Sequence, residues 1–195
     1  MADTVDEHAT YAQLVLAARR GDDLAMSDLV RRLTPSLWRV ARAHRLDTAT
    51  CEDVIQTTWL TLAEHLHDIR DPRAIVAWLM MTARRHCLAE LRRVKRIDLT
   101  ADVDEDGETE WRTPDRDVLD ADRDLRLRRA VGRLPDRDRL LLTLLVAQPP
   151  LSYTEISRVV GMPVGSIGPT RGRCLQRLRK ELHAEGWDDA SLLAH

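Results

Sequence analysis

Apolar residues recur at intervals of three and four along most of the chain, the spacing of amphipathic α-helices. A clear run passes from Leu24 through Leu29, Leu33, Leu37 and Val40. No segment shows the alternating apolar and polar pattern of a half-buried strand. The chain is therefore predicted to be all-α.

Four helices are predicted in the first half of the sequence. The first spans roughly Tyr11–Arg19, and the second carries the run just described. Thr48 or Thr50 is expected to cap the third helix, and Pro72 to open the fourth. Together these helices predict a compact four-helix domain over residues 10–97.

A second helical domain is predicted over residues 119–183, and it ends in the most informative stretch of the chain. Ser152 and Glu155 have the spacing of a capping box that starts a short helix. Gly161 and Pro163 end that helix, and a basic helix follows. A short helix, a tight turn containing glycine and a basic helix indicate a helix-turn-helix, a DNA-binding motif.

Pro169 falls inside the second helix of this motif. A proline in a helix interior costs about 3 kcal/mol, because its ring clashes with the preceding turn and it has no N–H to donate. We therefore expect the regular helix to begin near Ser166, with Pro169 in its first turn. Thr170, Arg171 and Arg173 would then lead into the major groove.

The net charge of −2 hides an uneven distribution. Residues 98–124 hold 3 basic and 12 acidic side chains, whereas residues 125–181 hold 12 basic and 4 acidic. The basic segment contains the helix-turn-helix and suits contact with phosphates. The acidic segment has too few apolar residues to form a core, so residues 98–118 are predicted to be a flexible linker.

Two tryptophans outside the predicted core have open roles. Trp111 in the linker is expected to touch a neighbouring helix, with a dedicated docking site as the alternative. In the short tail, residues 184–195, Trp187 and Leu192 are expected to cap the C-terminal helices, with a contact for a regulator as the alternative.

Several kinds of protein are disfavoured by composition. The three cysteines are far apart and show no CxxC pair, so neither disulfides nor a cysteine-based zinc site is expected. His65 and His67 point to different faces of a helix, and no metal or other cofactor is predicted. The apolar stretches are too short to span a bilayer, and the N-terminus does not resemble a signal peptide. These features indicate a soluble cytoplasmic protein.

Three motifs in order resemble the bacterial sigma-70 family. Cys51–Leu60 resembles its "aeDlvQetfl" segment, and Ala77–His86 followed by Leu91–Arg96 resembles "aWLyriArN…Rrrr". Leu134-Pro135 and Tyr153–Ile167 resemble the C-terminal "LP…sy.EIA..lg.p.gTV" segment. With two helical domains and one linker, the chain is similar to the small extracytoplasmic-function (ECF) sigma factors of RNA polymerase.

The resemblance implies partners and residue roles. The partners would be core RNA polymerase, through its β′ clamp coiled coil and its β subunit, promoter DNA and, as in most members, an anti-sigma factor. The polymerase-binding residues would be Asp53, Gln56, Thr57 and Leu60. Those that capture the single-stranded −10 element would be Arg73, Arg84, Arg85, His86, Arg92, Arg93 and Arg96. Those that read the −35 duplex would be Ser166, Thr170, Arg171, Arg173 and Arg177.

Trp78 lies beside the apolar stripe of the fourth predicted helix. Its ring can pack into the core or stack on a base, and core packing is the expected role.

Two other classes of function compete with the sigma-factor interpretation. The first is a stand-alone helix-turn-helix regulator with an N-terminal sensor or dimerisation domain. Only a sigma factor would lose polymerase binding on substitution of Asp53 and Gln56. The second is an enzyme, but the sequence has no glycine-rich phosphate loop, nucleophile elbow or HExxH motif, so no catalytic residue is predicted.

Overall fold

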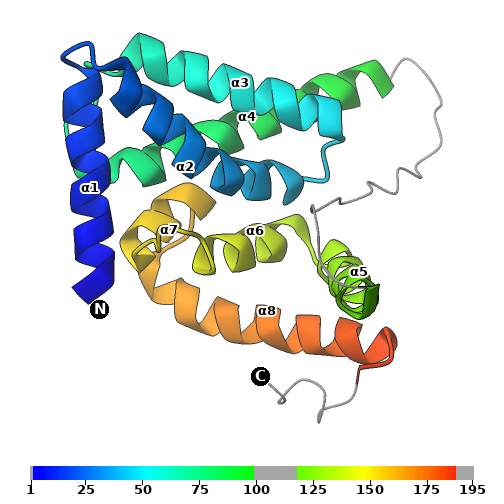
Figure 1. Cartoon of the computed structure of the whole chain (residues 1–195). Helices are drawn as coiled ribbons and strands as arrows, with labels where there is room; N and C mark the ends of the chain where they lie inside the picture. Colours follow the sequence, from blue (N-terminus) through cyan, green and yellow to red (C-terminus); the bar gives the residue numbers. More distant parts are fainter. Residues whose placement is uncertain (1, 99–117, 188–195) are drawn as a thin grey trace.

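In a computed structural model, the protein is described over residues 2–98 and 118–187, and this part of the chain contains helices and no strand. The all-α prediction is therefore confirmed. The elements are α1 (Ala2–Ala18), α2 (Asp23–Arg42), α3 (Thr48–His65), the 3-10 turn η1 (Pro72–Ala74), α4 (Ile75–Asp98), α5 (Val118–Gly132), α6 (Asp136–Leu145), α7 (Tyr153–Val160) and α8 (Val164–Ala184). Figure 1 shows α1–α4 as one group of helices and α5–α8 as a second.

Short polar side chains start the N-terminal helices. Asp22 accepts hydrogen bonds from the backbone N–H groups of Leu24 and Ala25 at 3.0 and 3.1 Å. The prediction that Thr48 or Thr50 caps α3 is wrong. Asp47 is the cap and accepts from the N–H of Thr50 at 2.9 Å, because an extended residue directly before the first turn can reach that donor.

Two other N-terminal boundaries differ from the predicted ones. α1 begins at Ala2 rather than near Tyr11. Pro72 opens only the turn η1, and α4 begins at Ile75. Asp71 precedes that turn and accepts from the N–H of Arg73 at 3.0 Å.

The helix-turn-helix has the predicted capping box. Ser152 accepts from the N–H of Glu155, and the Glu155 carboxylate accepts from the N–H of Ser152 at 2.8 Å. Gly161 ends α7 with φ of +70°, a left-handed conformation that glycine adopts without a steric penalty. α8 then begins after Pro163.

α8 is unbroken from Val164 to Ala184, so the expected late start near Ser166 is wrong. Pro169 lies inside the helix on its exposed side, and its ring faces away from the buried residues Ile167 and Cys174. Its missing N–H leaves only the carbonyl of the exposed Gly165 without a helical donor. Water can hydrate that carbonyl, and this explains why the helix tolerates the proline.

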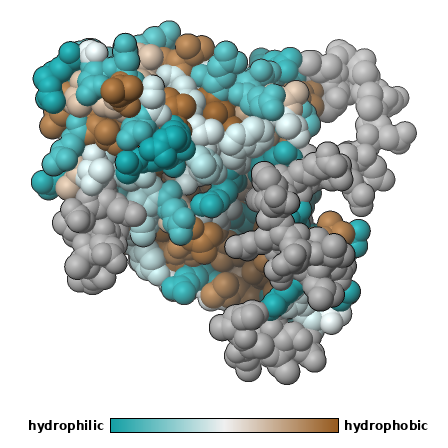
Figure 2. Space-filling model, viewed as in Figure 1, coloured by the Kyte–Doolittle hydropathy of each residue, from teal (hydrophilic) through white to brown (hydrophobic). Residues whose placement is uncertain are grey.

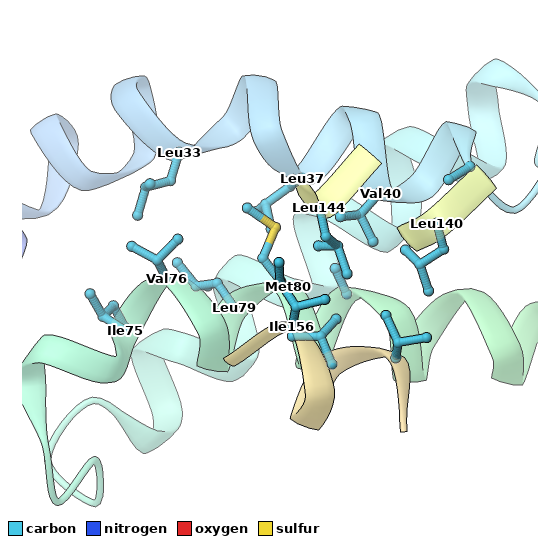
Figure 3. Close-up of a cluster of buried hydrophobic side chains, with 14 of the residues drawn as sticks. Leu33, Leu37, Val40, Ile75, Val76, Leu79, Met80, Leu140, Leu144 and Ile156 are labelled. Carbon is cyan, nitrogen blue, oxygen red and sulfur yellow. The ribbon is translucent and has the colours of Figure 1, made fainter. Parts of the chain in front are cut away.

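The two groups of helices share one hydrophobic core. α6 packs on α2, and α7 packs on α4. Figure 3 shows Leu37 and Met80 of the first group beside Leu144 and Ile156 of the second. All four side chains are buried. The predicted domain boundaries stay predictions, but the described helices are in direct contact across this junction.

Some predicted features lie outside the described residues, among them Trp111, most of the acidic linker and Leu192. Trp187 is described and lies against α5, with the Arg123 guanidinium 4.9 Å from its ring centroid. The carbonyl oxygen of Trp187 is 2.8 Å from Nδ1 of His183 in α8. This Trp187 contact agrees with its expected role as a cap on the C-terminal helices.

Figure 2 shows hydrophilic residues over much of one face, with smaller hydrophobic patches between them. Among the described helices, none combines the length and the apolar character that crossing a bilayer requires.

His44 is an exception in the core, since it is a polar side chain only 4% exposed and neither ring nitrogen has a hydrogen-bond partner. Burial lowers its pKa to about 4, the positive charges of Arg84 and Arg139 act in the same direction, and Asp136 opposes them. The folded chain therefore holds His44 neutral.

Replacing Pro169 with Ala should stabilise the protein. The alanine restores an N–H donor for the Gly165 carbonyl. The free energy gained in the folded helix exceeds the stability lost because the unfolded chain has more conformational entropy. We expect the free energy of unfolding to rise by about 2 kcal/mol, measured by urea denaturation. The control Pro163→Ala precedes the helix and should not stabilise it, and an unchanged or lower stability of P169A would contradict this account.

Acid should destabilise the fold through His44. The unfolded histidine takes a proton near pH 6.5, whereas the folded one does so near pH 4. The stabilisation is therefore complete above pH 6.5 and is lost as the pH falls toward 4. Between pH 7.5 and 5 it should amount to about 2 kcal/mol in urea denaturation. His44→Leu should flatten this pH dependence, and the control His67→Ala should retain it.

Candidate nucleic-acid interface

The basic residues of α4 do not form a single track. Arg85, Arg92 and Arg96 follow an i, i+7, i+11 spacing, which places them on one face of the helix. All three side chains are exposed. They make one positively charged stripe, the α4 stripe, that runs toward the C-terminal end of α4.

The other predicted −10 residues have different surroundings. Arg84 is half-buried, and burial followed by the nearby charge of Arg137 on α6 lowers the pKa of its guanidinium. His86 points to α3, where Nε2 lies 3.3 Å from the Thr61 hydroxyl, and burial lowers its pKa. Arg93 forms an ion pair with Glu90 at 2.7 Å.

Arg73 and Trp78 lie closer to the start of α4. Arg73 is exposed in η1, and its carbonyl oxygen is 3.3 Å from Nδ1 of His8. Trp78 is partly buried and packs against the hydrophobic core, as expected. The structure therefore separates both residues from the α4 stripe by at least one turn of helix.

The residues predicted to read the −35 duplex also divide between two faces. Because α8 is continuous, Ser166, Thr170, Arg173 and Arg177 follow an i, i+4, i+7, i+11 spacing and share a face, the α8 stripe. Arg171 projects from another side of the helix and is exposed.

Two contacts order the side chains of the α8 stripe. Arg173 donates to the Thr170 hydroxyl at 3.1 Å. Arg177 forms an ion pair with Asp138 of α6, whose side chain is only 8% exposed. Arg177 therefore holds α8 on α6 as well as facing the surface.

The residues predicted to bind polymerase share one face of α3. Asp53, Gln56, Thr57 and Leu60 are at i, i+3, i+4 and i+7, and all are exposed. The opposite side carries buried residues that include Val54 and Leu62. Leu60 is 57% exposed, so this α3 face has an apolar side chain with polar neighbours.

Sequence reasoning missed the residues that support these surfaces. Asp138 was not singled out, although its position in a leucine-rich helix marks it as a buried charge in need of a partner. Arg139 is 4% exposed and donates to the carbonyl oxygens of Ala43 and Leu134 at 2.6 and 2.9 Å.

The three cysteines are free and buried. Burial raises the pKa of Cys51 to about 11, that of Cys87 to about 12 and that of Cys174 to about 11. The thiols therefore stay protonated and unreactive at neutral pH. Among the described residues, no three His, Cys, Asp or Glu side chains are grouped so that they could hold a metal ion.

Comparison with known proteins identifies the family. Residues 29–97 match the Sigma-70 region 2 family. The ECF RNA polymerase sigma factor SigL of Mycobacterium tuberculosis is 33% identical over 151 residues, which cover 77% of this chain and 84% of SigL. The chain belongs to the ECF RNA polymerase sigma factors. This agrees with the resemblance of the three sequence motifs.

Another relative of this sigma factor covers more of the chain. The RNA polymerase sigma-H factor of Pseudomonas aeruginosa is 27% identical over 179 residues, covering 87% of this chain and 92% of that protein. The match therefore includes the C-terminal helices beyond region 2. These relatives support the sigma-factor interpretation over the stand-alone regulator.

Solved structures share the fold of this sigma factor. CnrH in complex with the cytosolic domain of CnrY has a TM-score of 0.64 at 22% identity, covering 90% of this chain and 98% of CnrH. RpoE of Bartonella quintana, in complex with the anti-sigma factor NepR, has a TM-score of 0.64 at 20% identity, covering 80% and 95%. At 22% and 20% sequence identity, these two structures show a shared fold and no more.

Replacing Arg177 with Ala should destabilise the C-terminal helices, because it leaves the buried Asp138 carboxylate without its positively charged partner. Since Arg177 is half exposed, we expect a loss of about 1–2 kcal/mol in urea denaturation. The matched variant Arg173→Ala removes an exposed cation from the same stripe and should change stability by less than about 0.5 kcal/mol. Equal effects of the two variants would contradict the anchoring role of Arg177.

Proposed function

We propose that this sigma factor uses three separate surfaces to start transcription. The α3 face binds core RNA polymerase, the α4 stripe binds the single-stranded −10 element, and the α8 stripe reads the −35 duplex. The observation that carries the proposal is that the residues of each surface share one face of their own helix, with exposed side chains on the α3 face and exposed arginines on both stripes.

The chemistry of the α3 face suits a protein partner. Leu60 supplies an exposed apolar contact, and Asp53, Gln56 and Thr57 supply polar groups around it. An apolar centre with a polar rim is typical of protein–protein interfaces. The family resemblance supports the β′ clamp coiled coil as the partner of this face, and the β subunit as a further contact of the sigma factor.

The two basic stripes suit different forms of DNA. The α4 stripe has three arginines in a row and can follow the phosphates of a separated strand. The α8 stripe combines hydroxyls and guanidiniums on the second helix of a helix-turn-helix, the helix that enters the major groove in such motifs. Arginine there can donate two hydrogen bonds to guanine.

We also propose that an anti-sigma factor regulates this chain. Two proteins of the same fold, CnrH and RpoE of Bartonella quintana, were solved with a bound partner, and NepR is named as an anti-sigma factor. The proposal includes a cytoplasmic location, where polymerase and promoter DNA are found, and a role in binding rather than in catalysis.

Run-off transcription with core polymerase from the native host tests this function. Fragments of the host genome serve as templates, and the complete sigma factor should produce transcripts that core enzyme alone does not. Asp53→Ala/Gln56→Ala should weaken core binding at least about tenfold, because it truncates polar groups of the interface. The matched control Gln13→Ala/Asp23→Ala changes the same residue types on α1 and α2 and should bind normally.

If the Asp53→Ala/Gln56→Ala variant lost DNA binding but kept core binding, this result would contradict the assignment of the α3 face to polymerase. Equal transcription with and without the protein on every template would overturn the proposed function. If the protein bound DNA but never associated with core polymerase, the interpretation as a stand-alone regulator would be favoured instead.

A further inference from the structure

Two arginines from different helices lie near each other without a counter-charge. Arg84 of α4 is half-buried, and Arg137 of α6 is exposed. Burial lowers the pKa of the Arg84 guanidinium, and the positive charge of Arg137 lowers it further. Nε of Arg84 is buried without a hydrogen-bond partner. In the described part of the chain, neither guanidinium has an ion pair or a hydrogen bond. Like charges at this separation repel, so the pair lacks an anion.

The surroundings of this pair add more positive charge than negative charge. Arg139 of α6 lies near Arg45, and Asp136 is the carboxylate that acts against them. That carboxylate already pairs with Arg139 at 2.6 Å. With Arg84 and Arg137 included, four guanidiniums accompany one carboxylate in this group of described residues, the arginine cluster. The cluster therefore attracts anions.

His44 is the buried neighbour of the arginine cluster. It is 4% exposed, and both of its ring nitrogens lack a hydrogen-bond partner. Burial lowers its pKa most, Arg84 and Arg139 lower it further, and Asp136 acts in the opposite direction. The neutral ring avoids adding another positive charge to the cluster. The groups gathered here thus need acceptors and negative charge rather than more donors.

The residue type and the exposure of the pair suit a phosphate. A guanidinium presents a planar fork of N–H donors that matches two phosphate oxygens, and charge-assisted hydrogen bonds of this kind are the strong ones. Because Arg137 is exposed and Arg84 is only half-buried, a small anion can reach both from solvent. Neither residue belongs to the α4 stripe or the α8 stripe, so DNA binding by those surfaces leaves the pair without a role.

We propose that Arg84 and Arg137 form a binding site for a small phosphate-bearing anion, which is either inorganic phosphate or the phosphate of a nucleotide. The anion bridges the two guanidiniums and supplies the counter-charge that the described residues lack. The other arginines of the cluster add attraction without direct contact. The site is separate from the three surfaces assigned to polymerase and promoter, and the inference does not rest on them.

Calorimetric titration of the complete chain with inorganic phosphate tests the site. Sodium chloride keeps the ionic strength constant near neutral pH, so that general screening does not change during the titration. The wild-type chain should bind one phosphate with a Kd of about 1 mM or tighter.

Removal of either arginine should weaken this binding. Arg84→Gln and Arg137→Gln should each raise the Kd at least about tenfold, because each removes one guanidinium that donates charge-assisted hydrogen bonds. The matched control Arg85→Gln removes an exposed guanidinium from the next position of α4. Its Kd should stay within about twofold of the wild-type value, because only a screened, more distant charge is lost.

Urea denaturation with and without phosphate gives a second readout. Phosphate should stabilise the wild-type chain and Arg85→Gln, because a ligand that binds only the folded state shifts the equilibrium toward it. Arg137→Gln should gain little. If Arg84→Gln does not fold, Arg137→Gln decides the test, since Arg137 is an exposed side chain.

Titrations with adenosine 5′-monophosphate and with adenosine distinguish the two sources of phosphate. Tighter binding of the monophosphate than of inorganic phosphate would assign the site to a nucleotide. Equal or weaker binding would assign it to free phosphate. Binding of adenosine that matches binding of the monophosphate would contradict a phosphate site.

Three further results would overturn the inference. The first is a wild-type chain that does not bind phosphate. The second is an equal loss of binding in Arg84→Gln and Arg85→Gln, which would indicate general attraction to basic surfaces. The third is an Arg84→Gln variant that loses affinity for single-stranded DNA and keeps its affinity for phosphate, which would make Arg84 a DNA contact instead.

Run-off transcription is scored independently of these titrations. A chain that binds phosphate through Arg84 and Arg137 but never supports transcription would leave this site standing and defeat the proposed function.

Discussion

The side chain of Arg139 is the contact on which the arrangement of the C-terminal helices depends. Its buried guanidinium donates to the carbonyl oxygens of Gly132 and Leu134 at 3.1 and 2.9 Å, at the turn between α5 and α6. It also reaches Ala43 after α2 and pairs with Asp136 at 2.6 Å. One cation therefore satisfies carbonyl groups from both halves of the chain, and this sets the direction in which α6 leaves the turn. Since α7 and α8 follow from α6, the helix-turn-helix takes its place from this side chain.

Local sequence signals were sufficient where the structure is decided locally. The capping box of Ser152 and Glu155 and the left-handed Gly161 depend on neighbouring backbone groups, and the sequence predicted both ends of α7. The predicted cap of α3 is wrong because Asp47, Thr48 and Thr50 all carry side-chain oxygens that can accept a backbone hydrogen bond. Only the path of the backbone decides which oxygen reaches the N–H groups of the first turn. The predicted start of α8 is wrong because the sequence does not show that Pro169 lies on the exposed side of the helix, where water can hydrate the unpaired carbonyl.

The candidate site shows a similar limit. The family resemblance assigned Asp53, Gln56, Thr57 and Leu60 to polymerase binding, and the structure places these residues on one exposed face of α3, opposite its buried apolar residues. Arg84 and Arg85 are neighbours in sequence, but Arg84 is half-buried near Arg137 of α6 and Arg85 is exposed, and the sequence alone does not show this neighbour from the second group of helices. The same holds for His44, which is buried near Asp136 and Arg139 of α6.

The ion pair between Arg177 and Asp138 restricts how this sigma factor can change its promoter preference during evolution. In its proposed −35 role Arg177 both contacts DNA and anchors its helix, so it cannot be exchanged freely, because each new side chain must also neutralise a buried carboxylate. Ser166, Thr170 and Arg173 carry no such obligation to α6. New −35 specificities should therefore arise in the first turns of α8, while its later turns keep a fixed register against the scaffold.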